Sequence, residues 1–179
     1  MGKKRKGEIM ERTLVILKPD CICRGLAGEI ISLFEKKGLK LVGMKMIKLT
    51  DEILDQLYAH HKGKKFFENL KGFMKQTPVI AIVIEGKNSI NVVRKMCGVT
   101  IGREADPGTI RGKYSMSLRY NIIHAADNEK SAEKEISLLF KDSEIYEYET
   151  NLPIYCEEEI EEEIKRPKIK PRKLPEKED

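Results

Sequence analysis

The chain has 179 residues, of which 35% are charged, and a formal net charge of +5. This length fits one domain with short extensions, and no apolar run reaches membrane-spanning length, so we expect a cytoplasmic protein without a membrane partner. Four cysteines are scattered without a CxxC pair, which argues against a disulfide framework and against a zinc site shared with His60 and His61. No hydrophobic segment follows the basic run KKRK, so no signal peptide is expected.

The charge is unevenly placed along the chain. The first ten residues carry +3 and the last 23 carry −2, which leaves +4 for the residues between 11 and 156. We predict a flexible basic arm over 1–10, a folded catalytic domain over 11–156, and a charged, disordered tail over 157–179, where no aromatic residue occurs. A mildly basic body suits an anionic small molecule at least as well as nucleic acid.

The first half of the chain predicts two strands around a helix. Arg12–Leu17 is a short apolar run typical of a buried strand, which Pro19 ends so that Lys18 lies at its mouth. Apolar residues at helical spacing follow over Gly25–Lys37, and Leu39–Leu49 alternates as a second strand does. The next expected elements are a helix from Thr50 or Asp51 to Tyr58, a helix over Phe66–Met74, a strand over 79–85, and a helix from Asn88 or Ser89 to Met96.

The second half predicts a long loop, a last strand and a last helix. Val99–Lys113 is rich in glycine and has no periodicity, and Tyr114–Leu118 alternates briefly as a fourth strand. Asp127 or Asn128 can cap a final helix, which runs to about Phe140. This order predicts an α+β protein of the ferredoxin-like βαββαβ type, a sandwich in which helices cover a four-stranded, mostly antiparallel sheet.

One stretch, Pro107–Glu135, holds a candidate catalytic histidine. His124 stands beside the pair Ile122–Ile123, and at about 100° per residue Glu135 lies at the edge of the apolar stripe of the following helix. A carboxylate there can face the histidine and hold its ring. Two structural alternatives remain open, namely a buried core histidine and a solvated glutamate that pairs with Lys134.

Polar residues near the ends of predicted elements indicate phosphate chemistry. Lys18, Arg94, Arg111 and Thr100 each adjoin a glycine, a proline or a helix end. Glycine lets backbone approach a ligand closely, and arginine presents a planar fork to phosphate oxygens, so with a histidine this set favours phosphoryl transfer. No Walker A loop and no GxGxxG occurs. Lys71-Gly72-Phe73 begins like an RNA-recognition motif but lacks its further aromatic residues.

Several separated blocks of sequence resemble the nucleoside diphosphate kinase family. The similarity extends from about Arg12 to Phe140 and includes the run around His124. The blocks are TLVILKPD at Thr13–Asp20, RGL at Arg24–Leu26, GEII at Gly28–Ile31, the pair Phe66-Phe67, PGTIRG at Pro107–Gly112, NIIHAAD at Asn121–Asp127 and SAEKE at Ser131–Glu135. Since they occur in one order, the resemblance is specific.

The resemblance implies transfer of the γ-phosphate of nucleoside triphosphates, chiefly ATP, to nucleoside diphosphates by a ping-pong mechanism. His124 would be the nucleophile that carries the phosphate, and Glu135 would orient its ring. The phosphates and ribose would be bound by Lys18, Tyr58, Arg94, Thr100, Arg111 and Asn121. Phe66 and Leu118 would form two walls for the base, which implies broad base tolerance. Mg²⁺ would arrive with the nucleotide phosphates rather than in a protein metal site.

The resemblance also implies a homo-oligomer, a hexamer or a tetramer. The sequence departs from the pattern of the family at three places. Ala126 stands where the family has serine, Lys64-Lys65 replaces an Arg-Pro pair, and Arg119-Tyr120 replaces a Gly-Arg pair. None of these removes a group that makes or breaks the bond to phosphorus. The alternative function is a nucleotide- or nucleic-acid-binding module with weak or lost turnover, although nucleic acid is not the expected partner.

Overall fold

The computed structural model describes residues 10–150, which form four strands and seven α-helices. The strands are β1 (Met10–Leu17), β2 (Lys40–Ile47), β3 (Val79–Lys87) and β4 (Ile123–Ala125). The helices are α1 (Pro19–Cys23), α2 (Ala27–Lys36), α3 (Asp51–Leu57), α4 (Phe67–Met74), α5 (Ser89–Cys97), α6 (Ile110–Tyr114) and α7 (Glu129–Leu139). Short 3₁₀ turns occur at Ala59–His61, Gly102–Glu104 and Asp142–Glu144.

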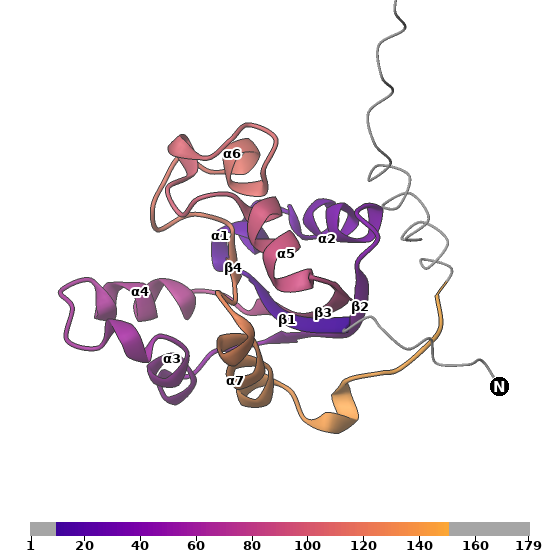
Figure 1. Cartoon of the computed structure of the whole chain (residues 1–179). Helices are drawn as coiled ribbons and strands as arrows, with labels where there is room; N and C mark the ends of the chain where they lie inside the picture. Colours follow the sequence, from indigo (N-terminus) through magenta and orange to yellow (C-terminus); the bar gives the residue numbers. More distant parts are fainter. Residues whose placement is uncertain (1–9, 151–179) are drawn as a thin grey trace, which may run out of the picture.

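The sheet has the order β2-β3-β1-β4, and each neighbouring pair is antiparallel. This order, with helices on both faces, confirms the predicted α+β fold with a ferredoxin-like sheet (Figure 1). The expected arm and tail lie outside the described residues, except Met10, which is the first residue of β1. None of the helices between residues 10 and 150 has the length and apolarity that a membrane span needs.

Alternation along the central strand divides the core into two layers. Leu14 and Ile16 of β1 pack into one layer, and Val15 and Leu17 pack into the other. Helices α3, α4 and α7 close the first layer, whereas α1, α2, α5 and α6 close the second (Figure 1). All four side chains are fully buried, and such burial contributes about 1.5–3 kcal/mol each relative to exposure.

Two predictions for the second half of the chain are wrong: the strand at Tyr114–Leu118 and the unstructured loop over 99–113. Tyr114–Leu118 is not a strand, because Tyr114 ends α6 and the residues after it follow an irregular path held by the Ser115 hydroxyl, whose Oγ donates to the carbonyl of Tyr120 at 2.7 Å. The fourth strand is the three-residue β4, which is too short to show an alternation in sequence.

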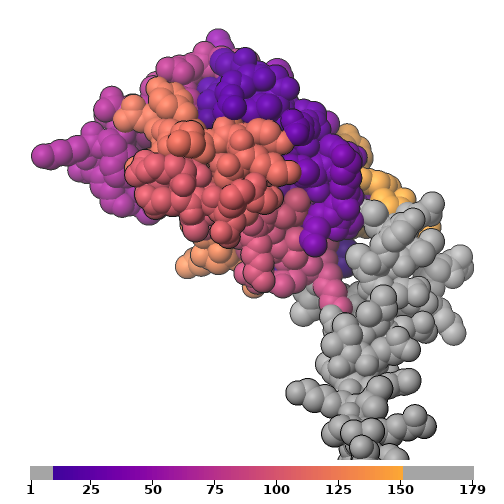
Figure 2. Space-filling model, turned by 90° about the horizontal axis from the view of Figure 1, so that it is seen from above, coloured from indigo at the N-terminus to yellow at the C-terminus, as the bar shows by residue number. Residues whose placement is uncertain are grey.

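The segment predicted as one aperiodic loop, 99–113, also contains structure. Thr109 caps α6 by accepting a hydrogen bond from the amide of Gly112. At Gly112 a Cβ would lie 2.0 Å from the carbonyl oxygen of Asp106, so only glycine permits this close approach. In the space-filling view this part of the chain gathers into one mass beside the indigo α1–α2 segment (Figure 2).

Candidate active site

A cavity of about 970 Å³ opens where β4, α7, the α3–α4 hairpin and the segment 117–121 meet. Its lining includes all ten side chains that the sequence predicts for the site: Lys18, Tyr58, Phe66, Arg94, Thr100, Arg111, Leu118, Asn121, His124 and Glu135. These residues come from positions spread over more than 110 residues of chain, so the fold brings them together. Their roles in binding and chemistry stay predictions.

His124 and Glu135 are in direct contact. His124 is the middle residue of β4 and pairs with Ile16 across the strand, which directs its side chain to the layer that α7 closes. Asn128 caps α7 by accepting from the amide of Ser131 at 2.9 Å, and this start places Glu135 two turns later on the inner face. His124 Nε2 lies 2.8 Å from Glu135 Oε2.

The contact determines which ring nitrogen is free to react. A carboxylate can only accept a hydrogen bond, so the hydrogen of the neutral imidazole lies on Nε2 and the lone pair lies on Nδ1. The side chains of His124 and Glu135 are only 17% and 11% exposed. Lys134, the alternative partner of Glu135, instead donates to the carbonyl of Gln56 at 3.4 Å.

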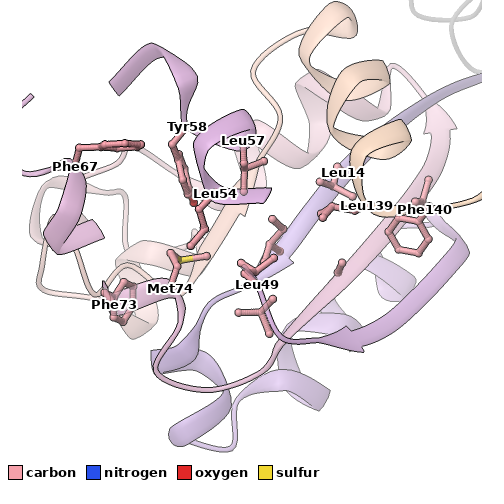
Figure 3. Close-up of a cluster of buried hydrophobic side chains, with 14 of the residues drawn as sticks. Leu14, Leu49, Leu54, Leu57, Tyr58, Phe67, Phe73, Met74, Leu139 and Phe140 are labelled. Carbon is pink, nitrogen blue, oxygen red and sulfur yellow. The ribbon is translucent and has the colours of Figure 1, made fainter. Parts of the chain in front are cut away.

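Tyr58 stands beside the histidine with an unused hydroxyl. Its ring lies edge-on to His124, with 5.7 Å between the ring centroids, and it is packed among Leu54, Leu57 and Phe67 (Figure 3). Tyr58 Oη is buried and has no hydrogen-bond partner in the described part of the chain. Burial, followed by the nearby charge of Glu135, raises the pKa of Tyr58 above its ordinary value, so the phenol keeps its proton and can donate to a ligand.

A strained turn precedes β4. Ile122 has φ +71°, a left-handed conformation that β-branched residues rarely adopt, and the amide of Ile123 donates to the carbonyl of Asn121 at 2.7 Å. This hydrogen bond spans two residues and closes a γ-turn of the strained, positive-φ kind. A non-glycine residue in such a conformation costs about 1–3 kcal/mol, so the surrounding contacts must hold it.

Lys18 and Asn121 form a buried polar pair. Lys18 Nζ donates to Asn121 Oδ1 at 2.6 Å, and Asn121 Nδ2 donates to the carbonyl of Thr100 at 2.9 Å. Lys18 is 7% exposed. Burial is the largest cause that lowers the pKa of Lys18, to about 8, and the charge of Arg111 acts in the same direction, whereas Asp20 and Cys97 oppose it.

Backbone carbonyls hold Arg111 in place. Its Nη1 donates to Gly98 at 2.7 Å and its Nη2 donates to Ile123 at 2.8 Å. Its Nε is buried without a partner among residues 10–150. Burial, the largest cause, lowers the pKa of Arg111 from its ordinary value, although a guanidinium stays charged over the physiological range. Together with Lys18 this gives two fixed cations in the cavity, a setting that attracts an anionic ligand.

The pKa of Lys18 predicts how nucleotide binding depends on pH. Because a phosphate favours the charged ammonium, ADP should bind more tightly below pH 8 than above it, and the dissociation constant should rise by up to about tenfold per pH unit above that value. Neither the nucleotide nor Cys97 titrates in this window, since phosphate ionises near pH ~6 and burial raises the pKa of Cys97 to about 11. Titration calorimetry from pH 7 to 9.5 tests this.

The matched control for that experiment is Lys18→Met, which should bind ADP more weakly and with an affinity that no longer changes over the same range. Equal pH dependence in the two proteins would contradict the assignment of this titration to Lys18.

Among the cavity residues that were not predicted for it, Asp127 and His61 contact predicted ones. Asp127, expected as a possible cap, instead binds Arg94, with 2.8 Å between its Oδ1 and Arg94 Nη1. His61 stacks against Tyr58 and lies edge-on to Phe66, with ring centroids 6.1 and 5.0 Å apart. The only sequence signal for His61 was its place in the basic run before Phe66. The Lys71-Gly72-Phe73 segment is helical, and Phe73 is buried, so it offers no exposed platform for RNA bases.

Helices α3 and α4, which carry the aromatic wall of the cavity, are tied together by charges. Lys71 of α4 binds Asp55 at 2.8 Å and Asp51 at 3.1 Å, and Lys75 binds Asp51 at 2.7 Å. Phe66, at the start of α4, and Leu118, on the facing segment, are 44% and 59% exposed. Both line the cavity, so each presents apolar surface to it.

A histidine paired with a carboxylate, fixed cations and exposed apolar side chains around one cavity on this fold are typical of a phosphotransferase that acts on nucleotides. A family model described as nucleoside diphosphate kinase matches residues 11–145. The nucleoside diphosphate kinase of Pyrococcus furiosus is 56% identical over 142 residues, which cover 78% of this chain and 88% of the relative. The enzyme of Parabacteroides distasonis is 55% identical over 84% of this chain and the whole of the relative.

Solved structures of the same family have the same fold. A halophilic nucleoside diphosphate kinase from Halobacterium salinarum, in complex with CDP, superposes with a TM-score of 0.81 at 40% identity and covers 83% of this chain and 99% of its own. A transition-state mimic of the enzyme from Borrelia burgdorferi, with vanadate and ADP, gives a TM-score of 0.75 at 39% identity over 79% of this chain and 94% of its own.

The chain belongs to the nucleoside diphosphate kinase family. The resemblance found in the sequence is thereby confirmed. The protein is an enzyme that transfers the γ-phosphate of nucleoside triphosphates to nucleoside diphosphates, and this decides against a module that only binds.

Proposed function

We propose that His124 is the residue that carries the phosphate between the two half-reactions. The observation that supports this most directly is the 2.8 Å contact between His124 Nε2 and Glu135 Oε2, which leaves the lone pair of Nδ1 available. Nδ1 attacks the γ-phosphorus, a P–N bond forms, and the bond from phosphorus to the β-phosphate oxygen breaks. The diphosphate leaves, and a second diphosphate then attacks the phosphohistidine so that the P–N bond breaks.

Glu135 stabilises the ring as it gains positive character. When Nδ1 gives its lone pair to phosphorus, the imidazole becomes more cationic and the Nε2–H bond becomes more acidic. A carboxylate that accepts this hydrogen bond in a largely buried setting opposes the build-up of charge and fixes the ring orientation. The same contact acts in reverse when the phosphohistidine discharges.

Six polar side chains form the cradle for the phosphates and ribose. Lys18, Arg94 and Arg111 supply the positive charge that the transferring group and the leaving phosphates require. Tyr58 Oη and Arg111 Nε support the proposal because each is a buried donor without a partner in the described chain. Asn121 and Thr100 complete the cradle and are joined by the hydrogen bond from Asn121 Nδ2. Arg94 would exchange Asp127 for a phosphate.

Phe66 and Leu118 hold the base by its faces. Stacking between two apolar walls contacts the π-face that every base has and reads no base edge, so the enzyme accepts several nucleosides. The half-exposed position of both side chains supports a base that enters from solvent and is exchanged at each half-reaction.

Mg²⁺ would be carried by the nucleotide phosphates. Over residues 10–150 no group of three or more His, Cys, Asp or Glu side chains is arranged to hold a metal ion. Two carboxylates line the cavity, Asp127 and Glu135. Glu135 is already bound to His124, so Asp127 is the carboxylate that could contact a metal ion. One carboxylate fits the usual mode of Mg²⁺, which keeps several waters and takes its other ligands from phosphates. Bound there, the ion would neutralise charge on the β- and γ-phosphates.

Exposed apolar side chains support a homo-oligomer, a hexamer or a tetramer. Met44 and Met46 lie on the edge strand β2 and are 56% and 60% exposed, and an edge strand is a template for contact between copies. Val99 and Met116, at the two ends of the segment that holds α6, form a second exposed set. Exposed apolar side chains in two parts of the chain suit an assembly with more than one kind of contact.

The cysteines support a cytoplasmic setting. Cys21, Cys23 and Cys97 are free thiols, as is usual in a reducing compartment.

Labelling tests the assignment of His124. Incubated with γ-labelled ATP and magnesium, the purified protein should take up label on His124 that resists alkali and is lost in acid, and added nucleoside diphosphates should remove it. A protein that exchanges phosphate but places the label on another residue would contradict the assignment.

A further inference from the structure

The strained turn at Ile122 is held by a segment that is distant in the sequence. Its carbonyl accepts a hydrogen bond from the amide of Lys18 at 2.9 Å, and its amide donates to Asp20 Oδ2 at 2.9 Å. Both partners belong to the short segment between the end of β1 and the first turn of α1. Both backbone polar groups of Ile122 therefore depend on one segment that lies about 100 positions earlier in the sequence.

Among the described residues, the carboxylate of Asp20 has no other hydrogen bond that would explain its position. Its second oxygen, Oδ1, is buried without a partner among the described residues, and Asp20 is not among the side chains that line the cavity. An amide in a left-handed turn faces away from the ladder of β4, so without the carboxylate it would be a buried donor with nothing to bind. Asp20 thus supplies the one acceptor that this conformation requires.

Three residues of the proposed mechanism lie within two positions of these contacts. Asn121 immediately precedes Ile122, His124 follows it by two residues, and Lys18 both holds the Ile122 carbonyl and binds Asn121 Oδ1 at 2.6 Å. A change in the φ angle of Ile122 would rotate Asn121 relative to His124. The charge of Asp20 also opposes the loss of the proton from Lys18.

We propose that Asp20 is a positioning residue of the phosphotransfer reaction: by accepting the hydrogen bond from the Ile122 amide, it holds the strained turn that sets Asn121 and His124 in their reactive arrangement. This inference rests on the proposed roles of His124 and Asn121. Asp20 does not contact the nucleotide and takes no proton. Its effect passes through the backbone and, secondarily, through its charge near Lys18.

The test compares Asp20→Ala, Asp20→Asn and Glu85→Ala by the rate of His124 labelling per folded molecule, as a function of pH. Asn can still accept from the Ile122 amide but has no charge. Glu85 is the matched control, because it is a largely buried carboxylate that binds Arg12 at 2.8 Å and Lys40 at 3.2 Å outside the cavity. Asp20→Ala should slow labelling about 10–100-fold, because the buried Ile122 amide is left unpaired in the reactive turn and that turn is populated less.

Asp20→Asn should recover most of that rate, to within about tenfold of the parent. The parent should lose rate as the pH rises through about 8, where Lys18 loses its charge near Arg111, Asp20 and Cys97. In both Asp20 variants this fall should begin at lower pH, and in Glu85→Ala it should not move. A role for Asp20 in stability alone predicts neither slower labelling per folded molecule in Asp20→Ala nor its recovery in Asp20→Asn, and the moved pH dependence reports the secondary effect of the charge.

The inference is overturned if Asp20→Ala labels within about threefold of the parent, or if it and Glu85→Ala slow equally with unchanged pH dependence. Should Asp20→Ala fail to fold, Asp20→Asn decides alone: because Asn keeps the acceptor for the Ile122 amide, labelling more than tenfold slower than the parent per folded molecule overturns the inference. Failure of the parent itself to label His124 would instead refute the proposed function, so the two failures are distinguishable.

Discussion

Replacing His124 with alanine should abolish phosphate transfer and the labelling of the protein by γ-labelled ATP. The loss should reach ~10⁴-fold or more, as expected when a covalent mechanism loses its nucleophile. The two other imidazoles that line the cavity, His60 and His61, cannot substitute. Their rings contact each other, with 3.9 Å between the centroids, and His61 Nδ1 lies 3.1 Å from Lys64 Nζ. Among residues 10–150, only His124 has a carboxylate partner, Glu135, that can stabilise a ring with positive charge.

Binding distinguishes loss of the nucleophile from loss of the fold. The cations that would hold the phosphates are anchored independently of the His124 ring, since Arg111 binds backbone carbonyls and Lys18 binds Asn121. His124→Ala should therefore still bind ADP in titration calorimetry, and His60→Ala and His61→Ala should still take up label. Transfer by His124→Ala within tenfold of the parent would show that another group carries the phosphate.

Residues with a strong local signal were predictable from the sequence. The apolar run of β1 and the helical spacing before Gly38 gave correct elements, because burial and periodicity act over a few neighbouring residues. Asn128 was one of two predicted caps and is the cap of α7. The helical spacing of about 100° per residue was enough to place Glu135 at the edge of the apolar stripe of that helix. The contact between Glu135 and His124 in the structure is consistent with this placement.

The structure between α5 and β4 was not predictable in the same way. α6 spans five residues and β4 spans three, which is too little for a period to emerge. The left-handed turn at Ile122 contradicts the preference of a β-branched residue and persists because Asp20 and Lys18 hold it from a distant part of the sequence. Local rules fail here because tertiary contacts override them, and the failure lies beside the reacting histidine.

Glu135→Gln should slow phosphate transfer by ~10²–10⁴-fold without abolishing it. The amide oxygen of glutamine can still accept from His124 Nε2, so the ring keeps its orientation and its Nδ1 lone pair. The amide has no negative charge, so the positive character that the imidazole gains in forming and discharging the phosphoramidate is no longer offset. Because Glu135 is 8% exposed, little solvent is present to replace that charge.

The matched control is Glu133→Gln, an exposed carboxylate two residues away on the same helix, which should transfer phosphate at the parent rate. Rapid-quench labelling gives the rate of phosphohistidine formation, and calorimetry with ADP gives the affinity, which Glu135→Gln should leave within a few-fold of the parent. A rate within threefold of the parent would mean that the contact only orients the ring. A large loss of ADP affinity would mean that the substitution disturbs the phosphate cradle, and the electrostatic role of Glu135 would then be wrong.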